Sequence, residues 1–258
     1  MSFFNKILAS VGIGAVQVDT RLEKSAYYPG EDIRGVIHIT GGNVEQNVDK
    51  IYIKLMTEYT RESNDKKYSE SFTLAKIRAS DKLIVQPGEK LEIPFEFPLP
   101  LETPLTLSRQ PVWLRTGLDI ENAIDPKDRD FIEVTPHPYA AVVFDAVSKL
   151  GFRFKEATCE YHSRLGRGIP FVQEIEFYPG REFAHRVKEL ELIMHLERDG
   201  LSVLVEVDRR GRGLSGWLEQ SFDMNERHAW LTFDSSDLEK GADHIAGLLE
   251  ELIDSKTR

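Results

Sequence analysis

A turn signal of proline followed by glycine occurs three times in this 258-residue chain, each time beside a run of alternating or β-branched apolar residues. The copies are Tyr28-Pro29-Gly30-Glu31, Gln86-Pro87-Gly88-Glu89 and Tyr178-Pro179-Gly180-Arg181. Proline fixes the first central φ angle of a β-turn, and glycine supplies the positive φ that a type II turn requires next. The signal predicts a chain of strands and tight turns. Because the first and third copies share a tyrosine, it also indicates two β-rich units in tandem.

Length and charge narrow the class of protein. The chain is long enough for one large domain or for two of about 130 residues, each with its own core. Its 43 acidic and 33 basic residues are spread along the sequence and give a net charge of −10. This charge disfavours non-specific binding to nucleic acid or to an anionic membrane. We therefore expect other proteins as partners, and a homodimer is compatible with the sequence.

The cysteine count and the hydropathy pattern favour a cytoplasmic protein. Cys159 is the only cysteine, so no intramolecular disulfide can form. The N-terminus is a poor signal peptide, and the sequence lacks the run of about 18 apolar residues that a membrane span requires. Residues 3–11 have helical apolar spacing. Such a short helix covers a sheet edge or core, or alternatively touches a membrane surface.

The first half of the chain alternates between apolar and polar residues. The alternation predicts strands at residues 16–22, 32–40, 48–59, 72–79, 82–85 and 91–97. Pro94 interrupts the last of these, which is typical of an edge strand because proline has no N–H to donate. Short strands separated by turn signals predict an antiparallel β-sandwich.

The second half begins with a helix and then returns to strands. Helical spacing predicts a helix over residues 139–150, capped by Gly151. Strands are predicted at 152–161, 171–177, 187–196, 201–207, 217–222 and 229–233, with a hairpin turn at 197–200. We therefore expect a mainly all-β fold of two tandem antiparallel β-sandwich domains. Their limits are residues 1–130 and 151–258, with a linker strand and helix at 131–150.

A C-terminal helix is predicted from residue 236 onwards. Ser236 and Glu239 have the spacing of a capping box, in which each side chain bonds the other residue's backbone amide. One apolar stripe follows, and we expect it to dock on the second domain. The stripe consists of Leu238, Ile245, Leu248, Leu249, Leu252 and Ile253.

The densest group of acidic residues lies near the expected domain boundary. It contains Asp119, Glu121, Asp125, Asp128 and Asp130. We expect a polar cluster between the domains, in which at least two of the last three carboxylates accept hydrogen bonds from arginines or backbone amides. A solvated loop is the plain alternative. Calcium binding is a further alternative, but this segment lacks the glycine and the final glutamate of an EF-hand loop. A hydrolase would need two of the carboxylates to face one cleft.

A glycine- and arginine-rich segment follows in the second half. Residues 211–216 match the dinucleotide-binding string, but strand-like residues follow where that motif requires a helix. Arg209, Arg210 and Arg212 would instead suit an acidic partner or a phosphate group. The alternative is a solvated hairpin tip.

The remaining reactive side chains indicate neither catalysis nor a metal site. The seven histidines are scattered without metal-ligand spacing, and His185 and His195 suit surface or packing positions. Cys159 lies in a strand pattern, where a buried inert thiol is expected. We expect no catalytic residues, no cofactor and no bound metal.

Three segments carry a resemblance to a known family. They are Tyr28-Pro-Gly-Glu with Gly35-Val-Ile-His-Ile, the run from Gln86 to Pro98, and above all the run from Thr116 to Asp130. Together they resemble the bacterial sporulation-control protein M family over nearly the whole chain. That family is similar in its N-terminal half to arrestins, which have two tandem β-sandwiches.

The resemblance implies a cytoplasmic, non-enzymatic regulator or scaffold that acts in the early control of endospore formation through protein–protein interactions. Two alternatives have other physical requirements. A hydrolase would use the acids between Asp119 and Asp130, and a peripheral membrane adaptor would use residues 1–12.

Overall fold

The computed structural model describes residues 16–64, 66–120, 127–209 and 228–257. The predicted N-terminal helix, Glu121, Asp125, the 211–216 segment and the 217–222 strand lie outside these residues. The chain forms two compact units. The first comprises Met1–Glu58, Ser71–Thr103 and Pro111–Thr135, and the second comprises Tyr59–Glu70, Pro104–Gln110 and Pro136–Arg258.

One sheet of the first unit has three antiparallel strands in the order β1 (Gln17–Leu22), β3 (Asp32–Thr40) and β7 (Lys90–Pro98). The period-2 alternation predicted all three strands. The edge position predicted for the last strand is confirmed, because β7 pairs only with β3 and Pro94 lies opposite Val36. Buried Ile33, Ile37 and Ile39 form the inner face of β3.

A second layer of the first unit is built on β4 (Gln46–Ser63), of which the part up to Glu58 belongs to this unit. β4 pairs with β8 (Val112–Ile120), as β8 does with β9 (Lys127–Phe131). β5 (Lys66–Ser80) and β6 (Leu83–Val85) also pair with β4, and β2 (Ala26–Tyr27) pairs with β10 (Glu133–Val134). The layers meet where Thr20 Oγ1 on β1 donates a hydrogen bond to Thr116 Oγ1 on β8, at 2.7 Å. Both threonines are buried.

Sequence reasoning missed β8, although it is the most buried strand of this unit. Arg115, Thr116 and Gly117 interrupt its apolar run and hide the strand pattern. Gly117 is required by packing, because a Cβ there would stand 2.6 Å from the hydroxyl oxygen of Tyr52. β4 and β5 also extend beyond their predicted ends, because pairing with each other satisfies backbone groups of the polar residues there.

In the described part of the second unit, five antiparallel strands follow one another in chain order. They are β11 (Arg153–Tyr161), β12 (Phe171–Tyr178), β13 (Val187–Glu197), β14 (Gly200–Arg209) and β15 (His228–Asp234). Glu197 pairs with Gly200, which confirms the predicted hairpin turn. A short 3-10 turn, η1 (Leu107–Arg109), contacts β11. The mainly antiparallel β fold with a C-terminal helix is confirmed.

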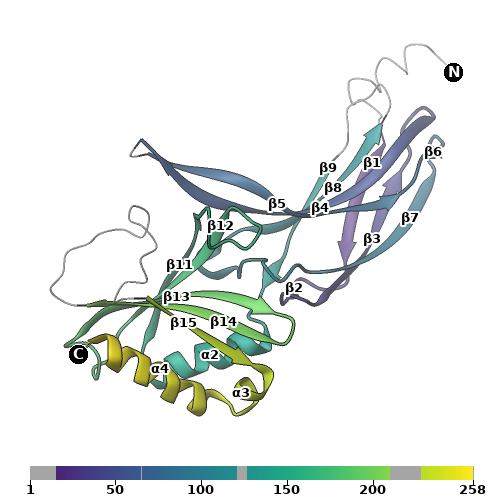
Figure 1. Ribbon diagram of the computed structural model, residues 1–258. Coiled ribbons are helices and arrows are strands. Elements are labelled where there is room, and N and C mark those ends of the chain that lie inside the picture. The colour runs from purple at the N-terminus through teal and green to yellow at the C-terminus, as the bar shows by residue number, and fades with distance from the viewer. Residues whose placement is uncertain (1–15, 65, 121–126, 210–227, 258) are drawn as a thin grey trace. The chain divides into compact units, whose positions relative to one another are not determined.

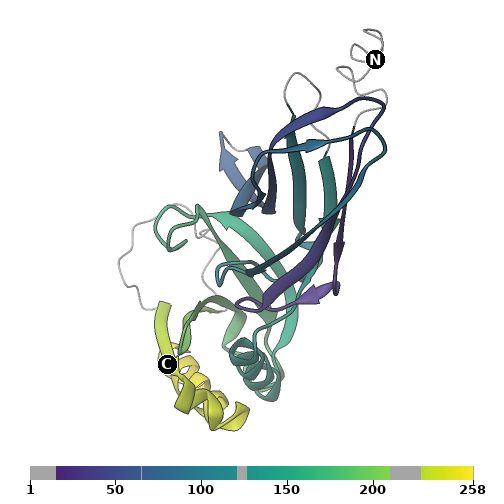
Figure 2. The same ribbon diagram turned by 90° about the vertical axis from the view of Figure 1, so that its right-hand side faces the viewer.

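Helices cover one face of this sheet (Figure 1, Figure 2). α2 (Pro138–Lys149) packs against α4 (Ala242–Thr257), and both contact β14. The predicted helix over 139–150 and its Gly151 cap are confirmed, since Gly151 has a φ of 79°. Apolar residues of alternate strand positions, including Leu190, Leu192 and Val205, face the helices and are buried.

The C-terminal segment contains two helices, where the sequence predicted one. α3 (Ser235–Glu239) ends before Gly241, whose φ of 86° breaks the helix, and α4 follows. The N-cap is Asp234, whose carboxylate accepts the amide of Asp237, so the capping box assigned to Ser236 was wrong. Of the predicted stripe, Leu238, Ile245, Leu249 and Ile253 are buried, and Leu248 and Leu252 are half-buried.

The three proline–glycine turn signals differ in the reason for which they need glycine. Gly30 and Gly88 have positive φ angles of 89° and 70°, as predicted. Gly180 does not, and it is needed for a different reason. A Cβ on Gly180 would stand 2.5 Å from the carbonyl oxygen of Gly151, so only glycine allows the two backbones to approach this closely.

Candidate functional site

The predicted acidic cluster lies on two neighbouring strands of the first unit. Asp119, on β8, forms an exposed ion pair with Lys50 at 3.0 Å. Asp128, on β9, accepts hydrogen bonds from the backbone amides of Thr20, at 2.6 Å, and of Arg129, at 2.9 Å. Asp128 is therefore held by backbone amides, which are one of the two kinds of donor predicted for this cluster.

Asp130 lies on the same face of β9 as Asp128. Its Oδ2 atom is buried and has no hydrogen-bond partner among the described residues. Burial, followed by the charge of Asp128 and a hydrogen bond to it, raises the pKa of Asp130 to about 7. Asp130 therefore keeps its proton to a higher pH than an ordinary aspartate does.

Within the described ranges, no arginine side chain donates a hydrogen bond to Asp119, Asp128 or Asp130. The Arg129 guanidinium lies over the ring of Trp113, at 4.9 Å, and near that of Phe131, at 5.9 Å. The partners found for Asp119 and Asp128 belong to the same unit. The role proposed for this cluster between the domains stays a prediction, as does the role of Asp125.

Arg209, Cys159 and His195, also singled out in the sequence, have buried or half-buried positions. Arg209 is half-buried at the end of β14, and Arg210 and Arg212 lie outside the described residues. Cys159 is buried, and burial raises the pKa of its thiol. Burial lowers the pKa of His195 to about 4, and its ring stacks on Trp230 at 5.6 Å. Among the described residues, no three histidine, cysteine or acidic side chains could hold a metal ion.

The structure brings together a set of carboxylates that sequence reasoning missed. On the face of the second sheet opposite the buried Leu190 and Leu192, one row of glutamates crosses the strands. Direct pairing places each member opposite the next, from β11 through β15. The row consists of Glu156, Glu176, Glu191, Glu206 and, at its end, His228. We call these five residues the acidic row.

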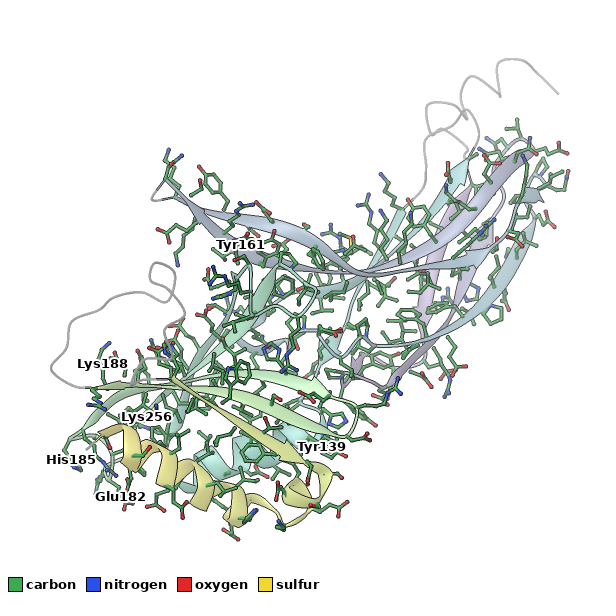
Figure 3. The ribbon with its side chains drawn as sticks, in the orientation of Figure 1. Tyr139, Tyr161, Glu182, His185, Lys188 and Lys256 are labelled. Carbon is green, nitrogen blue, oxygen red and sulfur yellow. The ribbon has the colours of Figure 1, made fainter. Side chains whose placement is uncertain are left out.

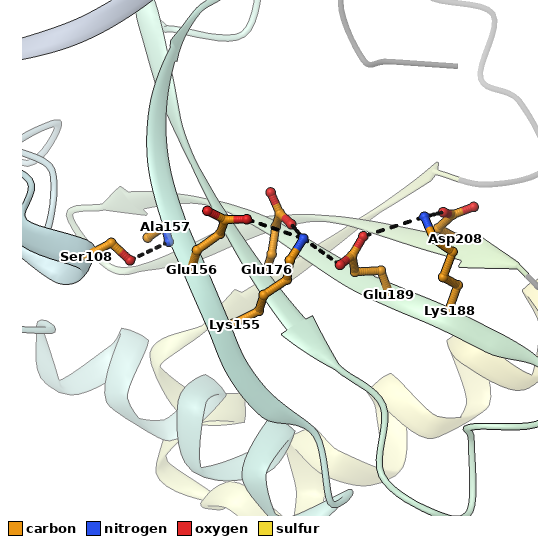
Figure 4. A network of polar contacts seen from close by, with 8 residues as sticks. All are labelled: Ser108, Lys155, Glu156, Ala157, Glu176, Lys188, Glu189 and Asp208. Carbon is orange, nitrogen blue, oxygen red and sulfur yellow. Dashed lines mark hydrogen bonds and ion pairs between the residues drawn. The ribbon is translucent and has the colours of Figure 1, made fainter. Parts of the chain in front are cut away.

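Like charges directly opposite on neighbouring strands repel each other, so the acidic row requires compensating cations. Lys155 supplies the largest compensation. Its ammonium group bonds Glu176, lies 2.6 Å from Glu189 and lies 3.3 Å from Glu156 (Figure 4). Burial opposes its charge, but these carboxylates prevail and raise the pKa of Lys155.

Two strand irregularities place lysines beside the row. Lys155 lies at the register shift between Phe154 and Glu156 on β11. Lys188 lies at the corresponding shift between Val187 and Glu189 on β13, and it pairs with Asp208 at 2.9 Å. A β-bulge inserts one residue and redirects side chains. Both bulges therefore bring a cation next to acids of neighbouring strands.

Glu174 lies two residues before Glu176 on the same face of β12, opposite Ile193, and is 8% exposed. Burial is the main cause that raises its pKa to about 8, and the charges of Glu191, Glu160, Glu176 and Glu206 add to it. Glu174 is therefore largely protonated at neutral pH. The sheet lowers its own repulsion by keeping this proton.

Among the described residues around the acidic row, carboxylates outnumber cations. There, Lys155, Lys188 and His228 lie beside seven acidic side chains. These are Glu156, Glu174, Glu176, Glu189, Glu191, Glu206 and Asp208. Such an arrangement attracts a cationic group. The signal in the sequence was the alternate spacing of Glu174 with Glu176 and of Glu189 with Glu191, which puts each pair on one strand face.

Comparisons with known proteins agree over nearly the whole chain. The SpoOM protein family matches residues 4–211. The chain is 43% identical, over 98% of both sequences, to the sporulation-control protein spo0M of Bacillus subtilis strain 168. It is also similar to the crystal structure of Spo0M from Bacillus subtilis, with 41% identity, a TM-score of 0.88, and coverage of 95% of this chain and 100% of that one.

The first prediction compares two lysine–carboxylate contacts of different burial. Lys155→Met leaves partly buried glutamates without their cation, so we expect a loss of about 3 to 5 kcal/mol in the free energy of unfolding. Lys50→Met removes an exposed partner of Asp119, so the loss should stay below about 1 kcal/mol. Urea unfolding of both variants measures the difference. Equal losses would show that Lys155 does not compensate the row.

The second prediction concerns pH. The pKa of Glu174 is higher in the folded chain than in the unfolded chain, so the folded state binds the extra proton. Stability must then decrease as pH rises from the ordinary glutamate value towards about 8, by up to about 1.4 kcal/mol per pH unit. Glu174→Gln removes this decrease.

The measurement is the stability difference between Glu174→Gln and the unmodified chain at pH 5, 6.5 and 8. We expect this difference to grow with pH in favour of the variant. Glu239→Gln, on exposed α3, is the matched control and should show a constant difference. A constant difference for Glu174→Gln as well would contradict the raised pKa.

Proposed function

The chain belongs to the SpoOM protein family, and we propose that it acts in the control of sporulation by binding another protein. The observation that supports this mechanism is the acidic row on the second unit. A sheet face that holds excess carboxylates is suited to a partner segment rich in lysine and arginine. Complementary charge speeds the encounter and selects the partner by its charge.

The geometry favours binding over catalysis. Asp119 pairs with Lys50, and Asp128 is held by backbone amides, so these carboxylates have structural partners. The name of the relative describes control rather than a reaction. We therefore propose a non-enzymatic regulator or scaffold that works in the cytoplasm, and its single cysteine, a free buried thiol, is compatible with that compartment.

The alternative of a membrane adaptor depends on residues 1–12, which lie outside the described part of the chain. No helix within the described ranges is both long and apolar enough to cross a membrane. Because the acidic row would repel an anionic lipid surface, it favours a basic protein partner over a membrane.

The test replaces the sporulation-control protein spo0M of Bacillus subtilis by this chain and counts heat-resistant spores. We expect the unmodified chain to restore sporulation. The triple variant Glu176→Gln, Glu191→Gln and Glu206→Gln should not restore it, although it keeps the size of each side chain and removes repulsion within the sheet.

The matched control removes three exposed carboxylates from the first unit by Asp32→Asn, Glu92→Gln and Glu96→Gln. It has the same net charge as the first triple variant and should restore sporulation. Thermal unfolding and protein level in the cell verify that both variants fold. Full activity of the acidic-row variant would contradict the proposed surface, and failure of the unmodified chain would contradict the role in sporulation.

A further inference from the structure

An open pocket of about 560 Å³ lies at one end of the second unit's sheet. It is formed where β11 and β13 begin and β12 ends, and its lining includes Gly151, Arg153, Tyr178, Gly180, Arg181 and Lys188. Figure 3 shows Lys188 at this end of the unit, together with Glu182 and His185. The volume is in the range of small-molecule sites.

Three cationic side chains line this pocket in a chain whose net charge is −10. Among the described residues, the guanidinium groups of Arg153 and Arg181 have neither an ion pair nor a hydrogen bond. Lys188 already pairs with Asp208 at 2.9 Å. The pocket therefore concentrates two uncompensated guanidinium groups next to a third, partly compensated cation.

The backbone and one aromatic ring shape the rest of the pocket. Gly151 and Gly180 approach so closely that a Cβ on Gly180 would meet the Gly151 carbonyl oxygen. This approach sets the ends of β11 and β12 side by side, with Arg153 and Arg181 flanking the contact. The Tyr178 side chain is exposed, and the ammonium group of Lys155 lies 5.9 Å from its ring centre. The third proline–glycine turn signal thus supplies the wall of a pocket.

We propose that this pocket binds a small molecule that carries a phosphate group on an aromatic or heterocyclic body. A phosphate dianion offers three oxygens, which suits the planar forks of two arginines and one lysine better than a single carboxylate does. The exposed ring of Tyr178 provides a flat apolar surface for the body of the ligand. The site adjoins the acidic row, with which it shares Lys188, but it uses none of the row's carboxylates and extends the function beyond protein binding.

The probes are phenyl phosphate, inorganic phosphate and benzoate, each titrated calorimetrically into the full chain. We expect phenyl phosphate to bind with one site per chain, and more tightly than either of the others. Arg153→Gln and Arg181→Gln should each weaken phenyl phosphate binding about tenfold or more. Tyr178→Ala should remove the preference for phenyl phosphate over inorganic phosphate.

The matched control is Arg198→Gln, an exposed arginine in the β13–β14 turn of the same unit, which changes the net charge equally. It should leave binding unchanged. Both lining arginines are exposed, so their variants should fold, and thermal unfolding verifies this. No saturable binding of phenyl phosphate, or equal weakening by Arg198→Gln, would overturn the proposal.

Discussion

Repulsion among carboxylates on neighbouring strands is the constraint on which the second unit depends. Strand pairing fixes the glutamates of the acidic row opposite one another, and it cannot be relaxed without breaking the ladder of backbone hydrogen bonds. Lys155 joins three strands through its carboxylate partners, and the β-bulge at its position is what aims it at them. The opposite face, buried under α2 and α4, supplies the apolar stabilisation that allows this arrangement.

In both units, a carboxyl group that no described cation compensates retains a proton. Glu174 in the second unit is buried, and Asp130 in the first has a buried Oδ2 atom. Both lie next to other carboxylates and have raised pKa values. Retaining a proton removes the charge that burial and repulsion oppose. In the second unit, Lys188 takes part both in the ion pairs beside the acidic row and in the lining of the pocket.

Local sequence patterns predicted the strands and helix ends that depend on neighbouring residues alone. Alternation gave β3, β7 and the strands of the second sheet, and Gly151 marked the end of α2. What depends on distant contacts was missed. β8 is defined by burial on both faces, Gly180 by the backbone of Gly151, and the acidic row by register across five strands. The acidic stretch near residue 128 was conspicuous in the sequence, but the partners found for Asp128 are the backbone amides of Thr20 on β1 and Arg129 on β9.

The central claim is that the acidic row forms the surface that receives a basic protein segment. The most direct measurement follows the side-chain carboxyl carbons of 13C-labelled glutamate by NMR while a lysine- and arginine-rich peptide is added to the full chain. The account predicts that the signals of Glu176, Glu191 and Glu206 shift together and saturably, while those of Glu92 and Glu96 on β7 stay in place. Shifts spread evenly over all glutamates, or absent from the row, would contradict it.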